Sequence, residues 1–291
     1  MSSLFQLSSA SIIGRDHHMD SRNSHDALNI VQDERIAVGI VCDGCSGQPG
    51  EHLDSEVGAK LGALLLSHTI YNYVFRAWWG DGWISRNINL KMILEQARVH
   101  SIARLKGFAL DLGPSLSATA YRNMLFTVVG FVITPATSAF FAVGDGYIVV
   151  NGQVIQIGPF PDNKPPYFAY GGLVESELAT HTPEATRFKI YCEIPTWRLG
   201  SFLIGTDGIQ DLVSSENLLV PGTQNPVGLF SQFWTDSRYF ETRTALQRKL
   251  NLVGRNISRV IDGNLVHIHS LLPDDTSMII GRRAPRVGKS V

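Results

Sequence analysis

The chain has 291 residues, 44% of them hydrophobic, which is enough for a sizeable buried core, and its formal net charge is −1 at pH 7. This balance, without long charge runs, argues against a protein that binds nucleic acid or a membrane surface through bulk charge. Three cysteines do not make a disulfide framework, no apolar run approaches the roughly 18 residues of a membrane span, and the N-terminus lacks the features of a signal peptide. We therefore expect a cytoplasmic monomer that binds neither nucleic acid nor a membrane.

The first predicted elements are two strands, Ala27 to Val31 and Arg35 to Cys42, joined as a hairpin by the polar turn at residues 32–34. Apolar residues then recur at helical spacing from Leu53 to His68 and again from Leu90 to Leu105. Each of these helices has one apolar face, so each is expected to pack against another element.

A block of closely spaced strands follows the helices. The predicted strands are residues 117–122, 125–133, 137–143, 147–150 and 154–157, separated by turn sequences. The simplest arrangement is an antiparallel meander, in which Asp145, between Gly144 and Gly146, is a hairpin-turn residue and not a ligand.

The second half begins with a weakly periodic segment from Pro159 to Trp197, which is expected to run over the surface, as functional lids often do. After it we predict a strand at 201–206, a helix beginning near Pro226, a helix at 242–253 and a final strand after Asp274. No repeat or low-complexity linker divides the sequence. It predicts one α+β domain over residues 1–291, with a core at about residues 11–281 and a flexible basic tail at 282–291.

Four aspartates border predicted strands, since Asp43 and Asp207 follow a strand and Asp26 and Asp274 precede one. If they converge, they repel one another unless a cation binds between them. Carboxylate oxygens suit Mg²⁺ or Mn²⁺, and Gly44 beside Asp43 lets the backbone approach an ion and offer a carbonyl oxygen. The alternative is that each aspartate is only a turn residue, because Asp-Gly is a common turn dipeptide.

Cys42 and Cys45 form a Cys-x-x-Cys pair, which allows a different hypothesis, a thiol redox or zinc site. A structural zinc ion needs two further ligands at matching spacing, and Cys192 alone does not supply them. Cys42 and Asp43 are neighbours at a strand end and point to opposite sides, so Cys42 is expected to be a small core residue.

Five short motifs, taken in order over about residues 11–281, resemble those of the metal-dependent type 2C serine/threonine protein phosphatases (PPM). They are Asp43-Gly-Cys-Ser-Gly47, Ser117-Ala-Thr-Ala120, Val143-Gly-Asp-Gly146, Asp207-Gly-Ile-Gln-Asp211 and Asp274-Asp-Thr-Ser277. The opening Gly14-Arg-Asp-His17, followed by His25-Asp-Ala27, is similar to the divergent bacterial branch of the family. Each motif alone is weak, whereas five in the family's order are fairly specific.

This resemblance implies a β-sandwich of two antiparallel sheets flanked by helices, with two divalent ions, Mn²⁺ or Mg²⁺, at one end. The implied metal ligands are Asp26, Asp43, Gly44 through its carbonyl, Asp207 and Asp274. Asp43 would bridge the ions, while Asp26 and Asp211 would order metal-bound water. A hydroxide held between two such ions can attack a phosphoryl group in line. The implied substrate is phosphoserine or phosphothreonine in a protein that a serine/threonine kinase phosphorylates.

Three positions depart from the family's pattern. His25 stands where many members have glutamate, and Cys45 stands where many have a histidine that serves as general acid. Ser21 occupies the usual place of the phosphate-binding arginine, so Arg22 beside it becomes the candidate and Arg15 lies further back. These departures motivate an alternative, a noncatalytic binding module with a phosphatase fold, against which the retained aspartates argue.

Overall fold

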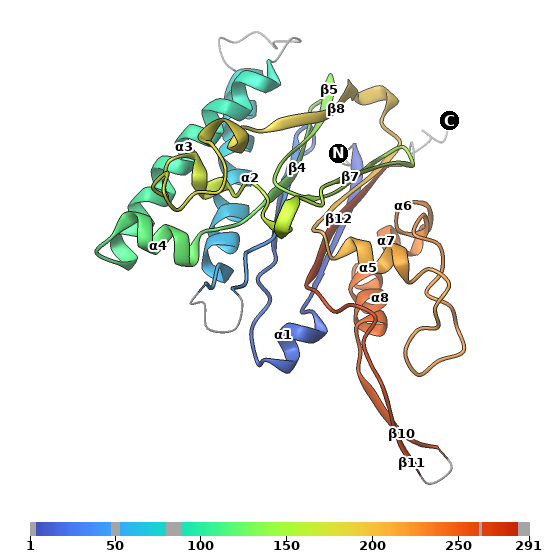
Figure 1. Ribbon diagram of the computed structural model, residues 1–291. Helices are drawn as coiled ribbons and strands as arrows, with labels where there is room; N and C mark the ends of the chain where they lie inside the picture. The colour runs from blue at the N-terminus through green and yellow to red at the C-terminus, as the bar shows by residue number, and fades with distance from the viewer. Residues whose placement is uncertain (1–3, 48–52, 80–88, 262–263, 285–291) are drawn as a thin grey trace, which may run out of the picture.

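Two antiparallel sheets lie face to face at the centre of the molecule (Figure 1). The computed structural model describes residues 4–47, 53–79, 89–261 and 264–284, and within them each of these sheets has five strands. One has the order β2 (Ala27–Gln32), β3 (Ala37–Cys42), β4 (Val128–Ile133), β5 (Thr137–Val143) and β8 (Lys189–Pro195). The other has the order β1 (Phe5–Ile12), β12 (Thr276–Arg283), β9 (Ser201–Gly205), β6 (Gly146–Val150) and β7 (Gln153–Ile157).

Central strands are buried on both faces, which explains their continuous apolar sequences. In β3, Val38 and Ile40 belong to the core beneath the helices, whereas Val41 belongs to the core between the sheets. In β4 the same alternation sends Val132 toward the helices and Phe131 toward the opposite sheet. A strand covered on both sides has no polar face, so its sequence does not alternate between apolar and polar residues.

Helices cover the outer face of each sheet (Figure 1), so the predicted flanked β-sandwich is confirmed. The first sheet is covered by α2 (Glu56–Trp79) and α3 (Leu90–Leu112), and α4 (Leu116–Asn123) packs beside these two helices. The second sheet is covered by α5 (Ile209–Ser214), α6 (Gln232–Thr235), α7 (Arg238–Glu241) and α8 (Ala245–Val253). The predicted helices at 53–68, 90–105 and 242–253 correspond to α2, α3 and α8, and the predicted β2–β3 hairpin is also confirmed. No helix in the described part of the chain is both long and apolar enough to cross a membrane.

The predicted strand at residues 117–122 is wrong, because this segment forms α4. The side chain of Ser115 accepts a hydrogen bond from the backbone N–H of Ala118 and so caps the helix N-terminus. Alanine favours a helix, and the cap decides the local conformation. The next predicted strand, at 125–133, begins only at Val128.

The predicted meander is also wrong in one connection. β4 pairs with β5 and β6 pairs with β7, but β5 and β6 belong to different sheets. The link through Gly144 and Asp145 therefore crosses from one sheet to the other instead of closing a hairpin. Strand spacing in the sequence does not reveal such a crossing, because a short link can join two stacked sheets as well as two paired strands.

Several smaller elements differ from the sequence prediction. Pro226 does not begin a helix; it forms an isolated bridge with Leu219, and the next helix starts at Gln232. The surface segment 159–197 contains the edge strand β8 and short 3-10 helices at Pro161–Asn163, Phe168–Gly171, Pro183–Thr186 and Thr196–Arg198. Strand β1, helix α1 (Arg15–Met19) and the hairpin of β10 (Ile257–Ile261) and β11 (Asn264–Ile268) were not predicted. Residues 282 and 283, assigned to a tail, continue β12, while 285–291 lie outside the described residues.

Close packing in the core between the two sheets gives a prediction at Gly39, where a Cβ atom would meet Phe131 and Ile279. A Cβ atom at Gly39 in β3 would overlap the ring of Phe131, so Gly39→Ala is expected to lower the free energy of unfolding by about 1–3 kcal/mol, measured by urea denaturation. Gly107 on α3 is the matched control, because a Cβ there meets no atom within 4 Å and alanine favours the helix by about 0.5–1 kcal/mol. Equal destabilisation by both substitutions would contradict the packing argument.

Candidate active site

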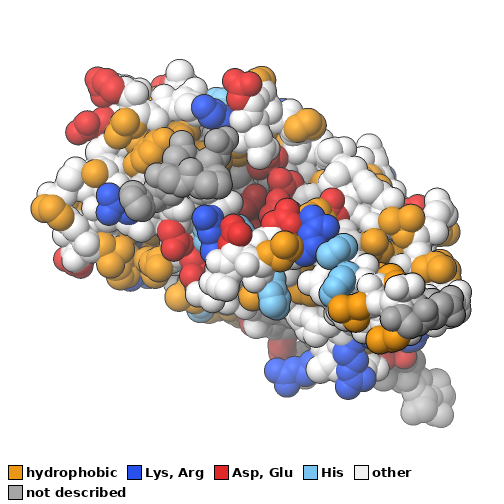
Figure 2. Space-filling view, turned by 60° about the horizontal axis from the view of Figure 1, so that its bottom comes forward, with side chains coloured by type: hydrophobic (Ala, Val, Ile, Leu, Met, Phe, Trp, Pro, Cys, Tyr) orange, Lys and Arg blue, Asp and Glu red, His pale blue; other side chains and the backbone are white. Residues whose placement is uncertain are grey.

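Acidic side chains gather in a hollow of the surface, where Figure 2 shows them in red. This hollow corresponds to a cavity of about 290 Å³ at the ends of the sheet strands. Its acidic lining consists of Asp43, Asp145, Asp162, Asp207, Asp274 and Asp275. Asp43, Asp145, Asp207, Asp274 and Asp275 lie within two residues of the ends of β3, β5 and β9 or of the start of β12, so four separate strand ends supply them.

Asp43 and Gly44 are fixed where β3 ends and the chain turns toward α2. The carbonyl oxygen of Asp43 accepts a hydrogen bond from the backbone N–H of Thr127 (2.8 Å), and the N–H of Gly44 donates to the carbonyl of His25 (3.2 Å). A Cβ on Gly44 would lie 2.8 Å from that His25 carbonyl oxygen and 2.9 Å from the carbonyl oxygen of Ser55. Only glycine therefore fits between these two backbone segments without a shift.

Asp26 lies behind the cavity wall and is only 4% exposed. Its Oδ2 accepts a hydrogen bond from the hydroxyl of Thr206 (2.8 Å), which joins the start of β2 to the end of β9. Its Oδ1 has no hydrogen-bond partner among the described residues. Burial, followed by the charge of Asp275, raises the pKa of Asp26 well above its usual range.

The acidic residues in and beside the cavity, Asp145 among them, influence one another electrostatically. The pKa values of four of them are raised to about 6, with desolvation as the largest cause in each: Asp145, Asp207, Asp211 and Asp274. Burial also raises the pKa of Asp43, and Asp207 and Asp26 are the next largest causes. Asp211 lies on α5 outside the cavity lining, and its strongest charged neighbour is Asp274. The fold thus assembles carboxylates that disfavour one another's ionised forms, an arrangement that a bound cation would relieve.

The chemistry of this donor set fits hard divalent cations, which prefer carboxylate and carbonyl oxygens. One oxygen of Asp26 and one of Asp145 are buried without a hydrogen-bond partner in the described structure, and an unpaired buried oxygen is costly. Within the described residues, however, no three His, Cys, Asp or Glu side chains are arranged around a common point to hold a metal ion.

The sequence prediction for Asp145 needs correction. Asp145 is 6% exposed, lines the cavity and lies in the link that crosses from β5 in one sheet to β6 in the other, so it is not a hairpin-turn residue. Its signal in the sequence was weak, because Gly-Asp-Gly is equally typical of a hairpin turn. Its place beside the predicted ligands follows from the assignment of β5 and β6 to different sheets.

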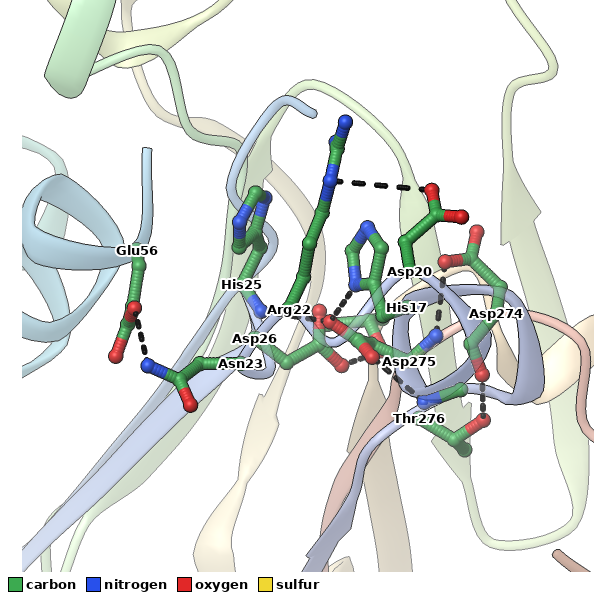
Figure 3. A network of polar contacts seen from close by, with 12 residues as sticks. His17, Asp20, Arg22, Asn23, His25, Asp26, Glu56, Asp274, Asp275 and Thr276 are labelled. Atoms are coloured by element: carbon green, nitrogen blue, oxygen red, sulfur yellow. Dashed lines mark hydrogen bonds and ion pairs between the residues drawn. The ribbon is translucent and has the colours of Figure 1, made fainter. Parts of the chain in front are cut away.

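Asp275 and His17 also line the cavity, and the sequence analysis gave neither of them a role. Asp275 accepts hydrogen bonds from the backbone N–H groups of Gly14 and His25, both at 2.6 Å, and from His17 Nδ1 at 2.9 Å (Figure 3). Burial by itself would raise the pKa of Asp275, but these hydrogen bonds outweigh burial and hold the pKa below its usual value. The donors lie about 250 residues before Asp275 in the chain, so no local sequence pattern could reveal these hydrogen bonds.

Arg22, the predicted phosphate-binding residue, lies outside the cavity lining. It borders a separate surface hollow near Asn23 and Glu56, and its Nε is 3.9 Å from the Asp20 carboxylate. Arg15 pairs with Asp16 instead (2.8 Å). Among the described residues that line the acidic cavity, the basic side chains are His17 and Lys164.

The two cysteines of the Cys-x-x-Cys pair differ in environment. Cys42 is fully buried in the core beneath the helices, and burial raises the pKa of its thiol well above the usual range. Cys45 is half-buried in the cavity wall. A buried protonated thiol such as that of Cys42 is inert. Among the described residues that line the cavity, six are aspartates and Cys45 is the single thiol. The geometry therefore favours the carboxylates over the thiols as the chemical groups of this site.

A family model described as Protein phosphatase 2C matches residues 13–251, which is most of the chain. The chain belongs to the protein phosphatase 2C family. The family resemblance read from the short motifs is therefore confirmed. The comparison with curated proteins found no match.

Solved structures with the phosphatase 2C fold are similar over nearly the whole chain. A bacterial serine phosphatase is 18% identical with a TM-score of 0.52, covering 96% of this chain and 98% of that one. A bacterial serine phosphatase bearing an arginine-to-alanine mutation is 14% identical with a TM-score of 0.53, covering 97% and 100%. Serine/threonine phosphatase Stp1 from Staphylococcus aureus is 14% identical, covering 98% and 97%, with a TM-score of 0.48. The two serine phosphatase structures with TM-scores above 0.5 show the fold, and at these identities they show no more than that.

Four of the five phosphatase 2C motifs read from the sequence border the cavity, through Asp43, Asp145, Asp207 and Asp274. The fifth, at residues 117–120, lies on α4, so its equivalence with a strand of the family is wrong. The segment that pairs with the Asp43 loop is 125–127 instead, since the N–H of Cys45 donates to the carbonyl of Leu125 (2.8 Å).

Proposed function

We propose that this phosphatase 2C member hydrolyses phosphoserine or phosphothreonine in proteins and depends on two Mn²⁺ or Mg²⁺ ions. The observation that carries this proposal is the group of aspartates, supplied by four strand ends, that surrounds one cavity and shows mutually raised pKa values. Carboxylates held in this way have no structural benefit on their own, because each one disfavours the ionised form of the others.

Within this proposal, each residue has a defined task. Asp43 would bridge the ions, the carbonyl of Gly44 would contact one of them, and Asp207 and Asp274 would hold the other. Asp26 and Asp211 would orient water at the site. When bound, the ions would lower the pKa of a water molecule and neutralise charge on the phosphoryl oxygens. The fold contributes the rigid strand ends that keep the acids around the cavity.

The proposed substrate is a phosphorylated protein, and a serine/threonine kinase would supply it. We further propose that the protein acts as a cytoplasmic monomer. A phosphoryl group on a side chain could reach the cavity from the surface, because the cavity opens in the hollow shown in Figure 2.

A noncatalytic binding module is the second candidate function. It is favoured by the absence, within the described residues, of any three donors arranged to hold one metal ion. It is also favoured by His25, which replaces a carboxylate of the family pattern and therefore brings no negative charge to the site; burial is the largest cause that lowers the pKa of His25 and favours its neutral form.

Hydrolysis of para-nitrophenyl phosphate and of a phosphothreonine peptide, each with Mn²⁺, Mg²⁺ or EDTA, distinguishes these functions. We expect turnover of both substrates with Mn²⁺ or Mg²⁺ and none with EDTA, and we expect Cys45→Ser to keep most of it. Metal binding without turnover would establish the binding module instead. Turnover that persists in EDTA, or that Cys45→Ser alone abolishes, would refute the two-metal proposal.

A further inference from the structure

Hydrolysis of a phosphoserine or phosphothreonine ester requires a proton for the departing oxygen. The leaving group is an alkoxide, which is far too basic to leave unprotonated at neutral pH, so a side chain that donates a proton accelerates the step. The donor must line the cavity and must hold a proton that it can release near neutral pH. Among the described residues of the cavity lining, the uncharged or cationic side chains that carry a polar hydrogen include His17, Cys45, Lys164, Tyr167 and Tyr170.

Among the described residues of the cavity lining, the tyrosines are Tyr121, Tyr167 and Tyr170, and a phenol is too weak an acid to release its proton readily at neutral pH. Tyr167 and Tyr170 are mostly buried, and burial is the largest cause that raises the pKa of each hydroxyl above its ordinary value. Cys45 also contributes to the raised pKa of Tyr167 through a hydrogen bond, so its thiol is engaged with that hydroxyl. Lys164 lies on the exposed segment after the 3-10 helix at 161–163, where a flexible ammonium suits contact with a phosphoryl oxygen.

His17 has the geometry of an oriented proton donor. It lies on α1, 13% of its side chain is exposed, and its Nδ1 is 2.9 Å from Oδ2 of Asp275. Figure 3 shows Nδ1 turned toward Asp275 and the other ring nitrogen, Nε2, turned away from it. Within the described residues, Nε2 makes no hydrogen bond. Asp275 is itself fixed by the backbone N–H groups of Gly14 and His25, so the imidazole has a defined orientation at the cavity.

We propose that His17, oriented by Asp275, is the general acid that protonates the leaving oxygen of the phosphoester. This inference rests on the proposed phosphatase function. In the step, a bond forms between phosphorus and the oxygen of water, and the bond from phosphorus to the side-chain oxygen breaks. The proton on Nε2 passes to that oxygen and gives the serine or threonine hydroxyl with inorganic phosphate. Nε2 then regains a proton from water. Asp275 acts as a positioning residue.

The charges around His17 favour the protonated ring. The hydrogen bond to Asp275 is the largest cause that raises the pKa of His17, burial opposes it, and the charges of Asp275 and Asp274 add to the increase. The charge of Arg22, on the loop after α1, lowers the pKa of His17. The ring centroid of His25 lies 4.6 Å from that of His17, and the pKa of His25 is itself lowered, so His25 favours its own neutral form. In the metal-free chain these charges favour the imidazolium form, and the geometry of His17 and Asp275 carries the assignment.

The test compares His17→Asn with His18→Asn on two substrates with different leaving groups. Asparagine can keep a donor near Nδ1 for Asp275 but cannot supply a proton at Nε2. His18, next to it on α1, is exposed and serves as the matched control. Because nitrophenolate leaves without protonation, His17→Asn is expected to lower kcat for a phosphothreonine peptide on the order of 10²-fold or more while lowering kcat for para-nitrophenyl phosphate only slightly. The wild-type protein should also lose kcat on the peptide at alkaline pH, and this alkaline limb should be absent in His17→Asn.

Each outcome decides the inference. Equal losses on both substrates, or an unchanged peptide kcat, would overturn the general-acid role while leaving the phosphatase function intact. If the wild-type protein with Mn²⁺ or Mg²⁺ hydrolyses neither substrate, the proposed function itself fails. Thermal unfolding of His17→Asn is the accompanying measurement, and a melting temperature equal to that of His18→Asn, together with a selective loss on the peptide, supports the role.

Discussion

Replacing Asp43 with asparagine is expected to abolish metal-dependent phosphatase activity, with a loss on the order of 10³-fold or more in kcat/KM. Asparagine keeps a carbonyl oxygen and nearly the same shape, but it removes the negative charge that would bridge two cations. Asp43 follows the buried strand β3, so its position depends on the strand and not on the charge itself. The measurement is steady-state hydrolysis of para-nitrophenyl phosphate and a phosphothreonine peptide in Mn²⁺.

Two comparisons make the Asp43 result specific. Asp111→Asn removes the same charge from an exposed position at the end of α3 and should leave turnover unchanged. The metal-free Asp43→Asn protein should be at least as stable as the wild type, because Asp207 and Asp26 lose a repelling neighbour. Turnover retained by Asp43→Asn would refute the two-metal mechanism, and a strongly destabilised variant would contradict the electrostatic account of the site.

Mn²⁺ is expected to stabilise the protein strongly at pH 7.5 and much less at pH 5. At a concentration 100 times Kd, a ligand that binds only the folded state adds about 2.7 kcal/mol to the free energy of unfolding. The pKa values near 6 of Asp145, Asp207 and Asp274 mean that protons compete with the ion below this pH. The measurement is the melting temperature with and without Mn²⁺ at each pH.

The sign of the pH effect follows from the same pKa values. Between about pH 4 and pH 6 the metal-free folded chain holds protons on these raised carboxylates that the unfolded chain has lost, so their contribution to stability falls as pH rises and is constant above 6. Asp275 works in the opposite direction, since its lowered pKa gives a contribution that is lost at acid pH. The difference between metal-loaded and metal-free melting temperatures cancels the contribution of Asp275, which both states share, and keeps the competition between protons and the ion at the raised carboxylates. A metal-induced shift that is as large at pH 5 as at pH 7.5, or that persists in Asp43→Asn, would contradict a carboxylate metal site.

The sequence alone determined the local elements that carry the first acids. The β2–β3 hairpin, the acid that follows the buried β3 and the long helix α2 after it depend on hydrophobic periodicity and turn residues that are close together in the chain. Three cysteines and short motifs also sufficed to favour carboxylate chemistry over a zinc or disulfide site, and the family match agrees with the motif reading.

Only the tertiary structure decided which residues share the cavity. Asp145 became a cavity residue because β5 and β6 lie in different sheets, and turn chemistry is the same for a hairpin and for a crossing. His17 gained its orientation from Asp275, 258 residues away, through a contact that exists only when β1 pairs with β12 and brings the two loops together. Local propensity fixes which residues form a strand, but burial on both faces leaves no polar pattern to say which strand is its neighbour, and that choice is made by the packing of the two sheets.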